Sequence, residues 1–245
     1  MKISPTAFES AFRRFLRLIE AQPNSGGPFR SFQKGVVERR EGYKTLIYEE
    51  ARRRLDVGKW RPVFGDGLIL HSVTRAIEIP KTRLYKNNNL VEWTGRYGPD
   101  GVSHGKLLAA VGKADARHDI EEAMYELYVK QADSPERCFG CLVDLLGARY
   151  DLLAYLFFLR DIEKYMPIKS TTFEEAFHLL GIDYELSGRC SWENYEGYLR
   201  RLESVQDMLN RQDIVPEIKR QVRLIDAHSF CWMLVEMKTS LPSSK

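Results

Sequence analysis

Two cysteines, Cys138 and Cys141, form a CxxC motif just after the expected start of a helix. The helix dipole and the free backbone N–H groups at such a place can lower a thiol pKa, as a redox dithiol requires. The pair could also bind zinc, with Cys190, Cys231 or a histidine as further ligands. No second CxxC and no strand of a βαβ unit accompany the motif, and apolar residues surround it. Buried thiols are therefore the favoured interpretation, and we predict neither a metal site nor a cofactor.

A metal-dependent nuclease needs carboxylates and a lysine, and Asp226, Glu236 and Lys238 have the order of such a set. Those groups should lie on adjacent strands, whereas the segment HSFCWMLVEMK has the apolar spacing of a helix. His104 and His118 lack the compact hairpin that a histidine-and-metal nuclease requires. The chain also has no nucleophile elbow and no phosphate-binding glycine loop. The sequence therefore does not indicate catalysis, and we predict no catalytic residues.

Charge is distributed unevenly along the chain, although the net charge is only +3. Residues 1–115 contain 21 Lys or Arg against 12 Asp or Glu, whereas residues 116–245 contain 16 against 22. A basic half favours an anionic partner such as DNA, although two halves that attract each other would look the same.

The densest basic cluster begins at the C-terminal end of an expected helix at residues 43–56 and continues in the segment after it. Basic side chains neutralise phosphates, and an aromatic ring among them can stack on a base. Trp60 could make such a contact, or it could be an anchor in the core, as tryptophans often are. The candidates for phosphate contact are Arg52, Arg53, Lys59 and Arg61.

A long irregular stretch, residues 81–105, is rich in asparagine and glycine. Loops of this length inside a compact domain are often functional. Planar rings, a guanidinium and asparagine amides could hold a nucleic-acid strand or read a base. In the alternative interpretation the asparagines serve turns and Trp93 packs inward. The candidates for base or strand contact are Trp60, Trp93, Arg96 and Tyr97.

Three segments, YLFFLRD at 155–161 with MPI at 166–168, CSWENY at 190–195 and DAHSF at 226–230, carry a family resemblance. They resemble parts of a helical region that accompanies HNH-type nuclease domains in prokaryotic restriction and defence proteins. The resemblance covers roughly residues 43–236 and implies a module that recognises DNA, or modified DNA, for a nuclease carried elsewhere. The chain has no recognisable HNH motif, so the resemblance supplies no catalytic residues.

Helical periodicity predicts an all-α fold, a multi-helix globular bundle of about nine helices with an irregular loop region at about 81–105. The segment from Tyr150 to Tyr165 is apolar on nearly every side, so we expect a buried central helix that Pro167 ends. Other starts follow from cap patterns: Ser4, Ser134 before Pro135, a capping box of Thr172 with Glu175, and Asp226. The expected helices cover residues 4–21, 43–56, 67–79, 106–111, 119–130, 135–147, 150–165, 173–180, 192–210 and 227–238.

The start MKISPTAFES has no apolar signal region, so we expect a cytoplasmic protein with free thiols. We expect a basic, candidate DNA-binding subdomain at 1–105 and an acidic scaffold at 106–245, or one continuous domain. The leading hypothesis is a DNA-binding protein with a nuclease or another protein as a further partner and no membrane contact. The alternative is a helical adaptor that binds a protein through an exposed apolar groove along 192–210.

Overall fold

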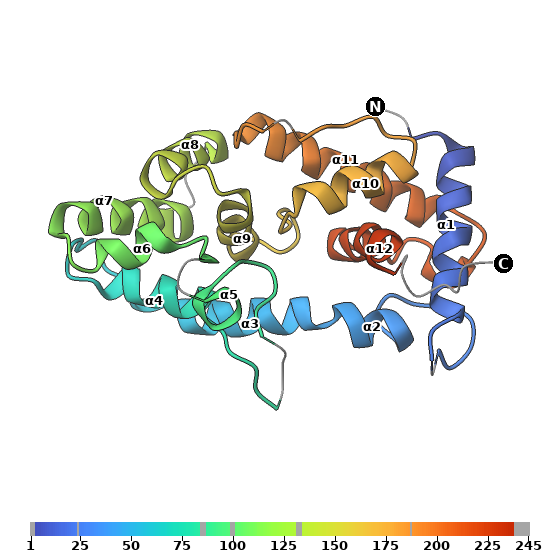
Figure 1. Cartoon of the computed structure of the whole chain (residues 1–245), viewed down its shortest axis with the longest axis horizontal. Coiled ribbons are helices and arrows are strands. Elements are labelled where there is room, and N and C mark those ends of the chain that lie inside the picture. Colours follow the sequence, from blue (N-terminus) through green and yellow to red (C-terminus); the bar gives the residue numbers. More distant parts are fainter. Residues whose placement is uncertain are drawn as a thin grey trace. The chain divides into compact units, whose positions relative to one another are not determined.

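The computed structural model describes residues 3–23, 25–83, 87–98, 101–130, 134–186 and 188–237, without the side chains of residues 96 and 97. Helices form the regular structure of these ranges, and no strand occurs in them (Figure 1). The predicted all-α fold is therefore confirmed. The α-helices are α1 (Pro5–Glu20), α2 (Gly35–Glu41), α3 (Tyr43–Leu55), α4 (Leu68–Ile77), α5 (Thr94–Tyr97), α6 (Gly105–Ala110), α7 (Ala114–Tyr125), α8 (Pro135–Leu146), α9 (Tyr150–Arg160), α10 (Ser170–Leu179), α11 (Trp192–Arg211) and α12 (Leu224–Glu236).

Two helices begin at the predicted serine caps. The Ser4 hydroxyl accepts a hydrogen bond from the backbone N–H of Ala7 at 3.5 Å, and the Ser134 hydroxyl accepts one from Arg137 at 3.2 Å. A proline at the next position of each helix has no N–H group that would need a partner. The predicted starts of α1 and α8 are therefore confirmed.

The central helix ends earlier than predicted. Helix α9 stops at Arg160, because Asp161 has an extended backbone with φ of −158°. The Asp161 carboxylate then accepts a hydrogen bond from the backbone N–H of Glu163 at 3.0 Å, which stabilises a local turn instead of another helical turn. The prediction that Pro167 ends this helix is wrong, since the chain has already left the helix before it.

Two other predicted caps are also wrong. Thr172 lies inside the first turn of α10, where its buried side chain contacts the Glu236 carboxylate at 3.4 Å instead of capping its own helix. Asp226 is the third residue of α12, and its carboxylate accepts a hydrogen bond from the backbone N–H of Arg223 at 2.9 Å. The helix therefore begins earlier than predicted, because the acidic residue reaches back to the cap from within the first turn.

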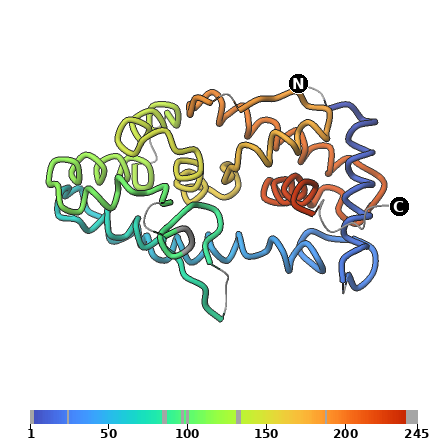
Figure 2. Tube along the Cα trace, in the orientation of Figure 1, coloured from blue at the N-terminus to red at the C-terminus, as the bar shows by residue number. Residues whose placement is uncertain are grey.

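The chain divides into two compact units, each built from separate segments. Unit 1 contains residues 1–43, 169–187 and 197–245. Within it, Phe230 of α12 contacts Phe8, Phe12 and Phe15 of α1 at ring-centroid distances of 5.1 to 6.3 Å. Figure 2 shows α1 in blue and α12 in red as neighbours, although they come from opposite ends of the chain. An aromatic core thus joins the two ends of the sequence in this unit.

Unit 2 contains residues 44–168 and 188–196. Its centre is α9, in which every residue from 152 to 159 is buried. Phe157 contacts the rings of Phe139, Tyr165 and Trp192 at 5.2 to 5.7 Å. The Tyr155 hydroxyl donates a hydrogen bond to the carbonyl of Ala76 at 2.7 Å, which satisfies the only polar atom of that side chain. The prediction that this segment is a buried core helix is confirmed.

Both units draw residues from each side of residue 105. The boundaries of these units thus differ from the change in charge near residue 105. The subdomains proposed at 1–105 and 106–245 stay a prediction based on charge. Among the described helices, none combines the length and apolar content needed to cross a membrane.

Candidate nucleic-acid interface

The predicted basic cluster lies at the end of α3 and in the turn that follows it. Lys59 and Arg61 are exposed, whereas Trp60 between them is buried, with 7% of its surface exposed. The Trp60 Nε1–H group donates a hydrogen bond to the carbonyl of Leu55 at 2.8 Å, and the ring meets Tyr128 edge-on. Trp60 therefore anchors the turn, and the two cations on either side of it point to solvent. The core-anchor alternative for Trp60 is confirmed.

The loop after Arg61 is fixed by two side chains of α7. The buried carboxylate of Glu121 accepts hydrogen bonds from the backbone N–H groups of Gly65 (2.7 Å), Gly67 (3.3 Å) and Leu70 (2.9 Å). Arg117, one turn earlier on α7, donates to the carbonyl of Gly65 at 2.7 Å. Gly65 and Gly67 have φ values of +89° and +91°, which residues with a Cβ atom rarely adopt. These contacts hold the backbone behind the basic turn in one conformation.

Two of the exposed cations already have acidic partners. The Arg53 and Arg54 side chains both contact Glu50 at 2.7 Å, and their hydrogen bonds lower the pKa of Glu50 to about 2. Lys59 forms an ion pair with Asp56 at 2.6 Å, and its side chain remains 80% exposed. Arg61 makes no ion pair with any described residue. Arg53 and Lys59 are exposed, so an anion can compete with the carboxylates for them, whereas Arg54 is largely buried.

The lowered pKa of Glu50 gives a testable pH dependence. The pKa lies below its usual 4.5 in the folded chain, so the stabilisation is present above about pH 4.5 and is lost as the pH falls toward 2. We expect Glu50→Gln to lower the free energy of unfolding at pH 7, because it removes the ion pairs with Arg53 and Arg54. The loss should be only about 1 kcal/mol, because Arg53 is largely exposed and solvent weakens its ion pair. Urea unfolding at several pH values should show this difference shrink in acid. The exposed neighbour variant Glu49→Gln should show no such trend, and an equal trend in both variants would contradict the assignment.

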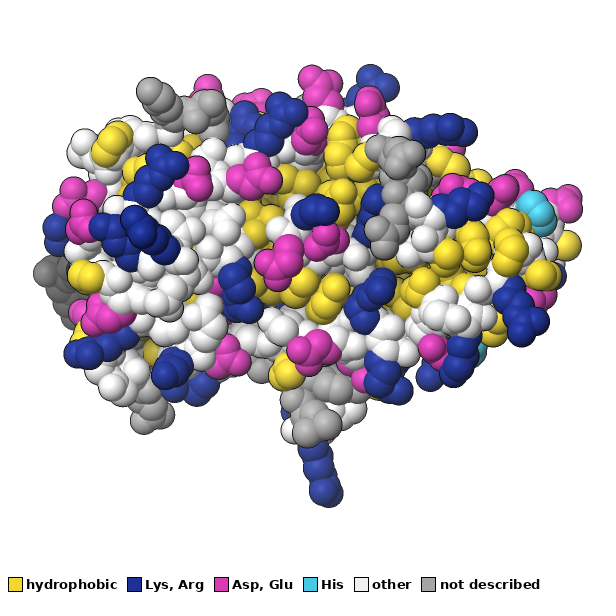
Figure 3. Space-filling model, turned by 180° about the vertical axis from the view of Figure 1, so that it is seen from behind, with side chains coloured by type: hydrophobic (Ala, Val, Ile, Leu, Met, Phe, Trp, Pro, Cys, Tyr) yellow, Lys and Arg dark blue, Asp and Glu magenta, His cyan; other side chains and the backbone are white. Residues whose placement is uncertain are grey.

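Arg54 extends the basic surface to a second helix. Its guanidinium donates hydrogen bonds to the carbonyls of Arg75 and Glu78, both at 3.0 Å, and thereby joins the ends of α3 and α4. Three further cations on α4 and in the segment after it are exposed: Arg75, Lys81 and Arg83. In Figure 3 a segment with a basic side chain projects from unit 2, and in Figure 1 this is the segment after α4. Sequence reasoning missed these three residues, because they lie outside the dense basic cluster at 52–61 and the Arg54 contacts that join α4 to α3 have no sequence signal. The basic surface consists of Arg53, Lys59, Arg61, Arg75, Lys81 and Arg83.

The remaining candidates have other environments. The Arg52 side chain is half-buried and donates a hydrogen bond to the carbonyl of Leu159 at 3.2 Å. Trp93 is buried, and its Nε1–H group donates to the carbonyl of Asn88 at 2.9 Å. Asn88 is itself buried and donates to the carbonyl of Ile77 at 2.9 Å. The turn-and-core alternative is thus confirmed for Asn88 and Trp93, and neither indole is placed to stack on a base. The side chains of Arg96 and Tyr97 lie outside the described residues.

The cysteine pair and the acidic residues considered for catalysis have other environments in the described part of the chain. Burial raises the pKa of Cys138 to about 11 and also raises that of Cys141, the opposite of what a reactive dithiol needs. No group of three or more His, Cys, Asp or Glu side chains that could hold a metal occurs in the described part of the chain. Asp226 is engaged with Arg223 and Gln33, and Lys238 lies outside the described residues.

The adaptor alternative requires an exposed apolar groove along α11. The apolar residues of this helix from position 195 onward are largely directed inward. Those that are buried are Tyr195, Tyr198, Leu199, Leu202, Val205 and Leu209. No large apolar residue of the described α11 is exposed, although the half-buried Met208 lines an open hollow of about 640 Å³ with Pro5 and Phe8 of α1. The adaptor alternative therefore stays a prediction.

Comparisons with protein-family models, with curated proteins and with solved structures found no match to this chain. The resemblance to helical regions of restriction and defence proteins therefore remains a prediction from the sequence.

Proposed function

We propose that this protein binds nucleic acid, with duplex DNA as the main ligand, through the basic surface of unit 2. The observation that carries the proposal is the arrangement at residues 59–61, where a buried tryptophan holds two exposed cations outward on a fixed turn. A fixed backbone with mobile cationic side chains suits phosphates, because no ordering of the loop is needed when the ligand binds.

The ligand is proposed to be contacted mainly at its backbone. Lys and Arg side chains that meet phosphates release condensed counterions, and this release makes binding strong at low salt and weak at high salt. Trp60 and Trp93 are buried, so we do not propose that their indole rings contact bases. The resemblance stated above adds the proposal that the chain recognises plain or modified DNA in a restriction or defence system, with cleavage carried out by another polypeptide.

Reversal of three charges tests this proposal. We expect the triple variant Arg53→Glu, Lys59→Glu, Arg61→Glu to bind a labelled duplex about 100-fold more weakly at low salt, because three phosphate contacts become repulsive. Fluorescence anisotropy should be measured at two salt concentrations with single-stranded and duplex DNA, each plain and cytosine-methylated. The natural chain should show a steep loss of affinity with salt, and the variant a shallower one. Circular dichroism should show unchanged helicity.

A matched control reverses three cations outside the basic surface. Lys164, Arg211 and Lys219 are exposed, and each pairs with one carboxylate, as Arg53 and Lys59 do. Their triple reversal to Glu changes the net charge by the same amount and should lower the affinity for DNA much less. Equal losses in both triple variants would mean that only net charge matters. No binding of the natural chain at low salt would contradict the proposal and favour a protein partner.

A further inference from the structure

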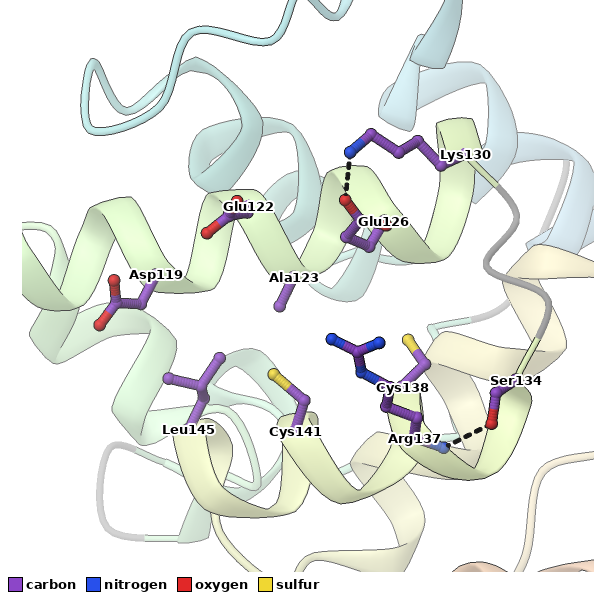
Figure 4. Close-up of a pocket in the computed structure, with 10 residues that line it drawn as sticks. All are labelled: Asp119, Glu122, Ala123, Glu126, Lys130, Ser134, Arg137, Cys138, Cys141 and Leu145. Carbon is purple, nitrogen blue, oxygen red and sulfur yellow. Dashed lines mark hydrogen bonds and ion pairs between the residues drawn. The ribbon is translucent and has the colours of Figure 1, made fainter.

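A second surface of unit 2 lies between α7 and α8. The two helices pack against each other, and an open groove of about 820 Å³ runs between them (Figure 4). Ala123, Cys141 and Leu145 are among its small or apolar lining residues, and charged side chains supply much of the rest of the lining. Cys141 is exposed, whereas Cys138 next to it is buried. The short side chains of Ala123 and Cys141 leave room for a regular element of another chain to approach the two helices.

Charged side chains occupy the two ends of this groove. Asp119 and Glu122 of α7 lie at the end near Leu145, and Lys130 and Arg137 lie toward the other end (Figure 4). Glu122 makes no ion pair within the described part of the chain, and Asp119 contacts only its neighbour His118, at 3.4 Å. One end thus carries two carboxylates, of which Glu122 has no ion pair in the described residues. At the other end Lys130 pairs with the Glu126 carboxylate, and Arg137 is the cation there without a described ion pair.

We propose that this groove binds an amphipathic helix of a partner protein. Its small apolar side chains would pack on the floor, and its Lys or Arg side chains would pair with Asp119 and Glu122. Two adjacent helices form a natural groove for a third, and complementary charge selects the partner and fixes its register. The Arg137 cation would match the negative C-terminal end of the bound helix. The direction of the bound helix is then fixed as well, and the Lys or Arg side chains of the bound helix lie in its N-terminal half.

This groove is separate from the basic surface. On α7, Asp119, Glu122 and Glu126 project from one face, whereas Arg117 and Glu121, which hold the loop after Arg61, project from the opposite face. The carboxylates of the groove repel phosphate, so the ligand of the basic surface does not fit here. The groove also includes the π-helical turn Glu126–Lys130, a rare conformation that is frequent at functional sites. A single helix can therefore support two different partners.

The exposed thiol of Cys141 provides a direct measure of occupancy. The probe is a synthetic helical peptide of roughly four turns, with Ala and Leu on one face and Lys on the other. We expect this peptide to slow the labelling of Cys141 by a fluorescent maleimide in a saturable way, by about tenfold. Mass spectrometry of the labelled chain assigns the site, and Cys141→Ser gives the background from the three buried thiols. A scrambled peptide of the same composition, in which no apolar face forms, should not protect the thiol.

Charge reversal in the groove provides the second test. We expect Asp119→Lys with Glu122→Lys to weaken protection by the Lys-containing peptide by about tenfold, and to favour a peptide with Glu in place of Lys. The control Glu163→Lys reverses an exposed carboxylate outside the groove and should leave protection unchanged. Three outcomes would overturn the proposal: no protection by any helical peptide, equal protection by the scrambled one, or protection by duplex DNA. Because binding of labelled DNA is measured on the same variants, a failure here is distinguishable from a failure of the basic surface.

Discussion

Replacement of Glu121 by glutamine is expected to lower the free energy of unfolding by about 3 kcal/mol, because a buried carboxylate loses its three charge-assisted hydrogen bonds. The side chain is fully buried, and its two oxygens accept from the backbone of Gly65, Gly67 and Leu70. Glutamine keeps the size but offers one oxygen and turns an amide NH₂ group toward backbone N–H groups. At least one buried donor is then left without a partner at the start of α4.

The effect of this substitution can be measured by urea unfolding followed by circular dichroism. The control is Glu122→Gln on the same helix, which removes the same charge from an exposed position and should change stability by less than about 0.5 kcal/mol. Since Glu121 also holds the loop behind Arg61, the variant should bind DNA more weakly even under conditions in which it is folded. A loss of stability no larger than that of the control would show that the three backbone contacts contribute little.

Much of the helical pattern was predictable from the sequence, because it depends on neighbouring residues. Ser4 and Ser134 cap helices whose next residue is proline, and the uninterrupted apolar run in α9 indicates burial on all sides. Some predictions failed because another local contact was formed, as at Asp161 and Asp226, and one failed because a distant contact replaced the local one. Thr172 resembles a cap in sequence, yet its side chain is buried and contacts Glu236.

The candidate site was less predictable for the same physical reason. The segment around Trp60 has the composition of a binding turn, and the inward position of the ring depends on the contact with the distant Tyr128 as well as on the hydrogen bond to Leu55. The loop with Gly65 and Gly67 gives no sign that a carboxylate from α7 occupies its N–H groups. The groove between α7 and α8 was also missed, since its two walls are brought together by packing and share no sequence motif.

Replacement of Trp60 by alanine is expected to lower the free energy of unfolding by about 3 to 5 kcal/mol, because it leaves a cavity where a large buried ring contacts Tyr128. Trp60→Phe retains an aromatic ring and removes the hydrogen bond to the Leu55 carbonyl, so a smaller loss of about 1 to 2 kcal/mol is expected. Both values follow from urea unfolding, and the change in tryptophan fluorescence offers an independent signal.

The same pair of variants separates an anchor from a base-stacking residue. If Trp60 acts only by holding Lys59 and Arg61 outward, Trp60→Phe should bind duplex and single-stranded DNA with nearly natural affinity wherever it is folded. Trp60→Ala should then lose affinity for both forms together, since the turn that presents the two cations is released. If the indole instead stacks on a base, Trp60→Ala should weaken binding to single-stranded DNA by about 1 to 3 kcal/mol more than binding to the duplex. That selective loss without a loss of stability would contradict the buried position of the ring and return Trp60 to the surface that meets the ligand.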